Sequence, residues 1–186
     1  MNHEMRRQQL ESFGRAPALL SAALRQFPKK MWLHKPSPDR WSIHEIILHL
    51  ADSEAGAYIR CRRFIAEPES PVLNFDPARW AGTLGYFHQS TREALEIIRR
   101  LRKATYQLLV ALPESVWEHT GNHPTDGRLS LAGWVEMQER HIPHHIDQMK
   151  QNYDTWLETH PPRKPASTSG RSSSRLPMVS MSASSF

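Results

Sequence analysis

The sequence predicts an all-α fold, a four-helix bundle followed by a disordered C-terminal tail. Four segments carry their apolar residues on one helical face, and proline-rich stretches separate them. Almost no segment alternates apolar and polar residues in the way that strands do. The 186 residues suffice for one compact core. We therefore assign residues 1–160 to a single bundle domain and residues 161–186 to the tail.

The first helix is predicted in two parts. A polar stretch covers residues 5–13, and Pro17 then stands in the first turn of a second part that covers residues 18–27. One face of this second part is apolar, and Pro28 ends it. The apolar residues are Leu20, Leu24 and Phe27.

The second helix has the clearest start signal in the chain. Ser42 is a good N-cap, and Glu45, three residues later, completes a capping box. We expect the helix to run to about Glu67, because Pro68 and Pro71 follow. Its apolar arc consists of Ile43, Ile46, Ile47, Leu50, Ala57, Cys61 and Phe64.

A long connection, residues 69–86, leads to the third and fourth helices. It is too long for a tight turn, so it either covers a pocket or crosses between distant helices. The third helix is predicted over residues 87–112, and the fourth begins after an N-cap at Ser130 and runs to about Trp156. The third helix has a seam with alternating steps of four and three: Ala94, Ile98, Leu101, Thr105, Leu108 and Leu112.

Composition limits the class of protein. The single cysteine, Cys61, cannot form an internal disulfide, which fits a reducing cytoplasm. The longest clean apolar run, residues 108–112, is too short to span a membrane, and we expect no signal peptide. The net charge of +5 lies mostly in the Ser/Pro-rich tail, which leaves the bundle nearly neutral. A near-neutral domain gives no support for nucleic-acid binding, and the tail cannot bury enough surface to fold.

Eleven histidines are many for this length, and three of them form a candidate metal site. His141 and His145 are four residues apart, so one helix presents both rings on the same side, at the border of its apolar face. His49, in the middle of the second helix, is the best third ligand. His44 is five residues from His49, so its ring points away from that of His49. His144 falls on the more polar side of the fourth helix. On spacing alone, the alternative is that all three are boundary residues with hydrogen-bonded rings.

Two segments resemble the signature regions of the DinB superfamily, most closely its YfiT-like branch. They are WSIHE together with HLADSE (residues 41–45 and 49–54), and HxxxHxxQM (residues 141–149). The likeness extends over residues 17–156. It implies a four-helix bundle with crossover connections, often a homodimer, that binds one divalent cation through His49, His141 and His145. Members of this superfamily include thiol S-transferases, thiol-dependent isomerases and proteins described as metal-dependent hydrolases.

Pro143 departs from an ideal helix, because it stands between the two histidines and clashes with the carbonyl of Glu139. We expect a kinked but continuous helix, since the apolar face stays in phase from Leu131 to Trp156. Asp52, Glu45 and Gln148 are candidates to orient the histidine rings. We predict that Cys61 packs in the core, whereas Trp80 and Tyr86 either line a pocket or anchor the connection.

The expected function is that of a metal-dependent enzyme acting on a small molecule. Three neutral imidazoles leave a coordination position open, which is the catalytic pattern. Nickel, zinc and manganese remain open as the metal. In the first interpretation the metal activates a low-molecular-weight thiol, the co-substrate, for transfer to an electrophile. In the second it activates water for hydrolysis. The third is a non-catalytic helical module that dimerises.

Overall fold

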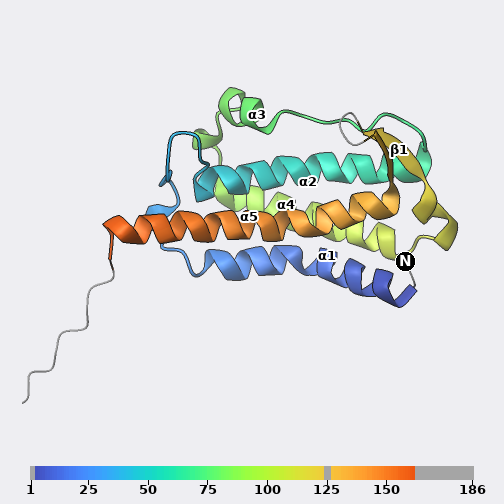
Figure 1. Cartoon of the computed structure of the whole chain (residues 1–186), viewed down its shortest axis with the longest axis horizontal. Coiled ribbons are helices and arrows are strands. Elements are labelled where there is room, and N and C mark those ends of the chain that lie inside the picture. Colours follow the sequence, from blue (N-terminus) through green and yellow to red (C-terminus); the bar gives the residue numbers. More distant parts are fainter. Residues whose placement is uncertain (1–2, 124–126, 162–186) are drawn as a thin grey trace, which may run out of the picture.

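The computed structural model describes residues 3–123 and 127–161 and forms a four-helix bundle. The long helices are α1 (His3–Leu24), α2 (Ile43–Ala66), α4 (Thr91–Val110) and α5 (Leu131–Thr159). In Figure 1, α1 and α5 run in one direction and α2 and α4 in the other. Both α1 and α2 pack mainly against α4 and α5, rather than against each other. The predicted bundle with crossover connections is confirmed. Residues 162–186 of the tail lie outside the described residues.

The connection between α2 and α4 runs back along the length of the bundle (Figure 1). It contains a short helix, α3 (Pro77–Thr83), which Asp76 caps and Pro77 opens. A single turn of 3-10 helix, Tyr86–His88, follows. The third helix of the bundle therefore begins later than the predicted residue 87, at Thr91, after an N-cap at Ser90. Two further 3-10 turns cover Lys29–Met31 and Glu114–Glu118.

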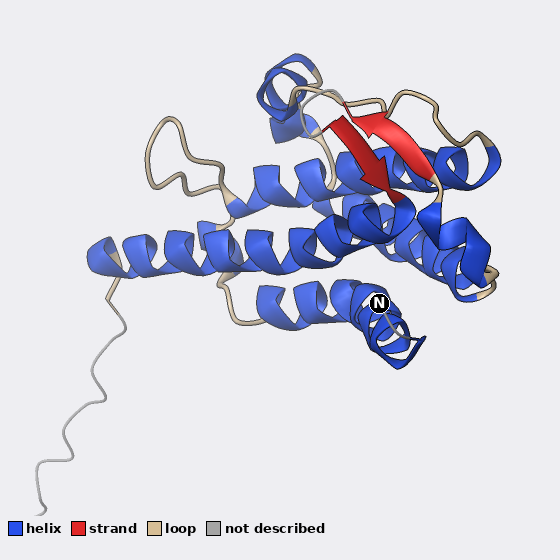
Figure 2. Cartoon of the chain, turned by 45° about the vertical axis from the view of Figure 1, so that its right-hand side comes forward, coloured by secondary structure: helices blue, strands red, loops and turns tan. Residues whose placement is uncertain are grey.

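A β-hairpin interrupts the all-helical pattern and was not predicted. Strands β1 (Thr120–His123) and β2 (Gly127–Ser130) pair antiparallel, as the red arrows in Figure 2 show. The crossover segment pairs with β1 as well: Val72 N donates to Asn122 O at 2.9 Å, and Asn122 N donates to Ser70 O at 3.1 Å. Strands of four residues are too short for the alternation of apolar and polar residues to reveal them in the sequence. Through this pairing, the hairpin holds residues 70–72 against the bundle.

Helix α1 corrects the prediction of two separate parts. It is one continuous helix of 22 residues with Pro17 inside it. A proline in a helix removes one backbone hydrogen bond and usually kinks or breaks the helix. Here the buried apolar residues stay on the same face of the helix before and after Pro17. Their burial on both sides of the proline keeps the two halves of the helix aligned. These residues are Leu10, Phe13, Ala16, Leu20, Ala23 and Leu24.

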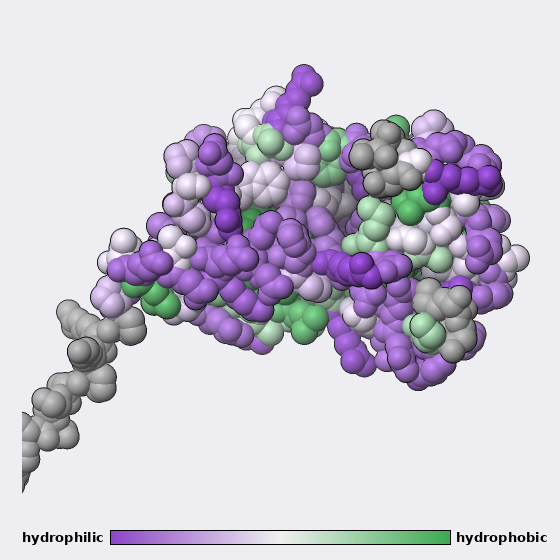
Figure 3. All heavy atoms as spheres, in the orientation of Figure 1, coloured by the Kyte–Doolittle hydropathy of each residue, from purple (hydrophilic) through white to green (hydrophobic). Residues whose placement is uncertain are grey.

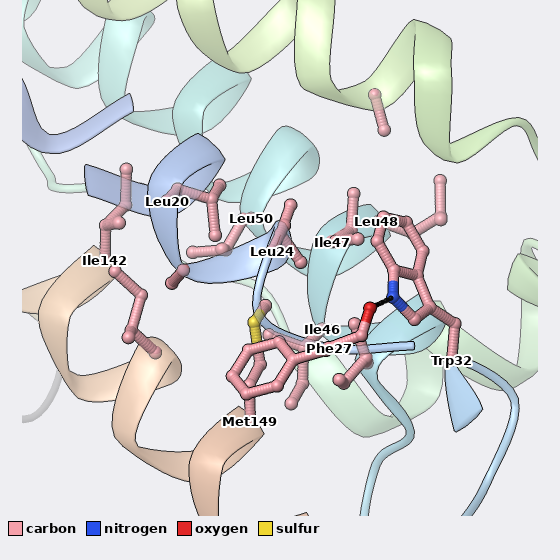
Figure 4. Close-up of a cluster of buried hydrophobic side chains, with 14 of the residues drawn as sticks. Leu20, Leu24, Phe27, Trp32, Ile46, Ile47, Leu48, Leu50, Ile142 and Met149 are labelled. Atoms are coloured by element: carbon pink, nitrogen blue, oxygen red, sulfur yellow. Dashed lines mark hydrogen bonds between the residues drawn. The ribbon is translucent and has the colours of Figure 1, made fainter. Parts of the chain in front are cut away.

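The core has two buried clusters, one toward each end of the bundle. Figure 4 shows the first, in which Leu20, Ile47 and Met149 from three helices meet and Trp32 Nε1 donates to Phe27 O at 3.3 Å. Hydrophilic residues cover most of the face seen in Figure 3. Within residues 3–123 and 127–161, no helix combines the length and apolar character that crossing a membrane requires.

Candidate metal centre

The structure brings the three predicted histidines together. His49 comes from α2, and His141 and His145 come from α5. Each ring offers one nitrogen to a set whose members all lie within 4.8 Å of one another. His141 Nε2 and His145 Nε2 are 3.2 Å apart. Two nitrogens that bind the same ion at about 2.05 Å are about 2.9–3.4 Å apart in octahedral to tetrahedral geometry, so this pair has the separation of metal ligands.

Helix α5 stays continuous through Pro143 and so keeps His141 and His145 on one side. Pro143 itself is exposed, whereas Ile142, Ile146 and Met149 are buried on the other side of the helix. That apolar packing holds the helix in phase across the missing hydrogen bond. The prediction of a continuous helix is confirmed.

The three imidazoles are neutral at neutral pH. Burial lowers the pKa of His49 to about 3 and that of His145 to about 4. Burial is the largest cause that lowers the pKa of His141 to about 2, and the repulsion that protonated His141 would meet from His145, His49, Arg102 and His144 adds to it. A neutral imidazole keeps a lone pair for a cation, whereas a protonated one repels it. The electrostatics of the site therefore favour the ligand form of each ring.

Hydrogen bonds on the outer side of the rings also fit a metal site. His145 Nδ1 donates to Gln148 Oε1 at 2.8 Å, which leaves the lone pair of His145 Nε2 directed at His141. The Ser53 hydroxyl lies 3.4 Å from His49 Nε2, and His49 Nδ1 is buried and has no hydrogen-bond partner among the described residues. A buried polar nitrogen without a partner is costly unless a ligand satisfies it. Three nitrogen donors suit zinc, nickel and other first-row ions.

Of the three candidates for orienting the rings, Gln148 is the one for which the described residues show a hydrogen bond to a site histidine. The Tyr86 hydroxyl donates to Asp52, and burial together with this carboxylate raises the pKa of Tyr86. Glu45 accepts from Ser42 N at 2.8 Å in the capping box and pairs with Lys35 at 3.0 Å. Both acids thus have structural partners.

The structure also shows where the other residues singled out in the sequence lie. Cys61 is fully buried in the core, and burial raises the pKa of its thiol to about 12, as expected for a packing residue. Trp80 packs against Phe75 with ring centroids 4.4 Å apart and stays partly exposed. His144 is exposed and accepts from Gln148 Nε2 at 2.9 Å.

Two aromatic residues of the site were missed. The ring of Trp41 lies 4.7 Å from that of His49 and 6.5 Å from that of His145, between centroids. Phe75, from the crossover segment, lies 6.3 Å from His49. Trp41 directly precedes the N-cap of α2, a position from which a large side chain can fold back over the helix start, whereas nothing in the sequence near Phe75 indicates its position.

Beside the histidines lies a cavity of about 190 Å³. Its walls come from α2, the crossover segment, the end of β2 and α5. The lining includes His49, Ser53, Phe75, Trp134, Gln138 and His141. A small molecule can therefore reach the two histidines from this side.

Replacing Gln148 by Leu should weaken metal binding by about 10–100-fold, the effect expected when a partner that orients a ligating imidazole is removed. The variant leaves His145 Nδ1 without its acceptor. Competition with a chromophoric chelator measures the affinity. The matched control is Gln151→Leu on the next turn of α5, whose side chain accepts a hydrogen bond from Arg40 and lies outside the histidine cluster. Equal affinities in both variants would show that Gln148 does not orient the ring.

Comparison with known proteins agrees with this site. The sequence model of the DinB superfamily matches residues 12–149. A protein of Oceanobacillus iheyensis, provisionally named a metal-dependent hydrolase, is 34% identical over 107 residues, which cover 57% of this chain and 61% of the relative. A Bacillus mycoides protein with the same provisional name is 27% identical over 105 residues, 56% of this chain and 60% of the relative. The chain thus spans about 60% of the length of the curated relatives it matches.

Two solved structures share the fold. YfiT from Bacillus subtilis, described provisionally as a metal-dependent hydrolase with an unusual four-helix bundle topology, superposes with a TM-score of 0.77 at 19% identity over 84% of this chain and 90% of YfiT. A mutant of a mycothiol-dependent maleylpyruvate isomerase superposes with a TM-score of 0.63 at 12% identity over 82% of this chain and 66% of the isomerase. Because the superfamily model covers well over half of the sequence, the chain belongs to the DinB superfamily.

Proposed function

We propose that this protein is a divalent-metal-dependent enzyme in which His49, His141 and His145 hold the ion and a low-molecular-weight thiol is transferred to an electrophilic small molecule. The observation that carries the metal site is the meeting of three neutral, buried or half-buried imidazoles at the edge of a cavity. A divalent cation held there would lower the pKa of a bound thiol or water.

The surroundings of the histidines favour a thiol over water as the nucleophile. In the described part of the chain, no hydrogen bond joins any of the three imidazoles to a carboxylate. The nearby acids are engaged elsewhere: Asp52 with Tyr86, and Glu54 with Arg102. A site without a free general base suits a nucleophile that needs none, and a thiol bound to a cation loses its proton outright. The mycothiol dependence of the structurally similar isomerase points in the same direction.

The proposed transfer balances without a further reactant. The thiolate sulfur forms a bond to the electrophilic carbon, and the leaving group, chloride in a chlorinated test compound, departs with its bonding pair. The thiol proton passes to water. Trp41 and Phe75 cover the histidines with apolar rings, which limits the access of bulk water to the nucleophile.

Elemental analysis of protein expressed without an affinity tag tests the proposal. We expect about one equivalent of a divalent metal, nickel, zinc or manganese, and its loss in His145→Ala. Protein loaded with each metal is then assayed for conjugation of monochlorobimane with a panel of thiols, and for hydrolysis of a p-nitrophenyl ester without thiol. Conjugation that depends on both metal and thiol supports the transferase.

The other outcomes each contradict part of the proposal. Ester hydrolysis without thiol supports the second candidate, a hydrolase, which the names of the curated relatives favour. A metal-free protein that is equally stable with and without His145 supports a non-catalytic helical module. The expected homodimer stays a prediction, and sedimentation of the same samples tests it.

A further inference from the structure

Arg60 lies on the same face of α2 as the metal-site histidine. His49, Ser53, Gly56 and Arg60 follow one another at steps of four, three and four residues, so one stripe of the helix carries them all. His49, Ser53 and Arg60 line the cavity of about 190 Å³ beside the histidines. Arg60 is thus a positive charge about three turns from His49 along one wall.

The guanidinium of Arg60 is held in place but not neutralised. Arg60 Nε donates to Leu73 O at 2.7 Å, and its guanidinium carbon lies 5.8 Å from the centroid of Phe75. No acid among residues 3–123 and 127–161 forms an ion pair with it. Burial lowers the pKa of Arg60, but a guanidinium stays protonated at neutral pH. In the described part of the chain, Nη1 and Nη2 of Arg60 make no hydrogen bond, and a half-buried cation with free donors is suited to bind an anion.

Gly56 gives the guanidinium its room. A Cβ built at Gly56 would lie 2.9 Å from Arg60 Nη2 and 3.4 Å from its Cζ. The arginine therefore lies back along α2 over the glycine, in the direction of Ser53 and His49. A larger residue at position 56 would push the guanidinium away from this position.

A second cavity meets the first at Arg60. It has a volume of about 360 Å³ and lies between α2 and the crossover segment. Four residues line both cavities, and the remaining walls of the larger one are mainly apolar. The shared residues are Arg60, Val72, Asn74 and Phe75. The other walls include Ile59, Phe64, Leu73 and Trp80. His49 and His141 line the first cavity, the second is mainly apolar, and Arg60 lines both.

We propose that Arg60 binds a carboxylate of the substrate, with an apolar group of the same molecule in the larger cavity and its reactive part facing the histidines. This inference rests on the proposed function only for that last orientation. A single negative charge is favoured, because the other arginine of the larger cavity, Arg63, already pairs with Glu67 at 3.1 Å. A planar carboxylate also matches the two parallel donors of a guanidinium.

Binding of two naphthalene probes to the full-length protein tests the proposal. The probes are 2-naphthoate and its neutral counterpart 2-naphthamide, and ligand-observed NMR titration gives each dissociation constant. EDTA is present throughout, so that a carboxylate cannot gain affinity by binding a metal ion. We expect 2-naphthoate to bind at least about fivefold more tightly than 2-naphthamide, the preference that a charge-assisted hydrogen bond gives.

Variants then assign the preference to Arg60. Arg60→Gln should bring the ratio of the two constants to about one, and Arg60→Lys should restore part of the ratio. Gly56→Ala, which keeps the charge but displaces it, should lower the ratio too. Arg63→Gln is the matched control in the same cavity and should keep the wild-type ratio.

A ratio near one in the wild type, or a wild-type ratio in Arg60→Gln, would overturn the proposal. Since the titration contains no metal and measures no turnover, it can fail while the metal site stands. Conversely, a protein that never binds metal can still show the preference, so the two proposals fail separately.

Discussion

Replacing Glu54 by Gln should lower the free energy of unfolding by about 3–5 kcal/mol, as expected when one partner of a buried ion pair is removed. The Arg102 side chain is fully buried, and that of Glu54 is 3% exposed. Arg102 Nε donates to Glu54 Oε2 at 2.9 Å, and Arg102 Nη2 donates to the other carboxylate oxygen. Without the carboxylate, the guanidinium remains in the core with no counter-charge. Denaturant unfolding with EDTA, at constant pH, measures the change.

Two controls separate the ion pair from general sensitivity of the core. The double variant Glu54→Leu with Arg102→Met replaces both charges by apolar groups and should recover most of the lost stability. Glu96→Gln removes exposed pairs with Arg99 and Arg100 and should cost less than about 1 kcal/mol. If the double variant is as unstable as Glu54→Gln, the uncompensated charge is not the cause.

The ion pair also explains how four helices are joined near the metal site. Arg102, in α4, bonds to Glu54 in α2, donates to the backbone oxygen of Gln138 in α5 at 3.2 Å, and lies 4.0 Å over the ring of Phe13 in α1. Gln138 is three residues before His141. A change in the Glu54–Arg102 pair should therefore shift the His141 ring.

The sequence predicted the parts of the fold that depend on local periodicity. The capping box of Ser42 and Glu45 and the apolar arc of α2 are found as expected. The seam of the third helix was only partly right: Ala94, Ile98 and Thr105 are buried, but its other buried residues are Arg102 and Leu109. An arginine is assigned to the solvent face by any hydropathy pattern, and only its partner on another helix shows that it belongs inside.

The candidate site likewise has one part that local sequence patterns predict and one part that they do not. The spacing of His141 and His145 and the position of His49 within α2 made these rings candidate ligands, and the resemblance to the DinB superfamily implied that the three meet around one ion. Contacts between distant segments were not predictable, because no local pattern records them. Trp41, Phe75 and the hairpin-held crossover belong to this second group, and so does the pairing of Asp52 with Tyr86, 34 positions apart.

Acidification of the metal-free protein should lower its stability steeply, by about 2–4 kcal/mol between pH 7.5 and 5.5. The folded-state pKa values of the three histidines lie at about 2–4, whereas the pKa of an unfolded histidine is about 6.5. Below pH 6.5 the unfolded state thus binds up to three more protons than the folded state. Stability is therefore highest above pH 6.5 and falls as the pH decreases toward the folded-state values. Each histidine contributes at most about 1.4 kcal/mol per pH unit.

The variant His145→Gln isolates this contribution from all other titrating groups. It removes one of the three histidines, so its loss of stability between pH 7.5 and 5.5 should be smaller than that of the wild type by about one third. Denaturant midpoints at several pH values, with EDTA present, give both curves. Parallel curves for wild type and variant would mean that His145 is protonated in the folded state as easily as in the unfolded one. A ring of that kind could not keep its lone pair free for a cation at neutral pH, so the same experiment tests a physical requirement of the proposed metal centre.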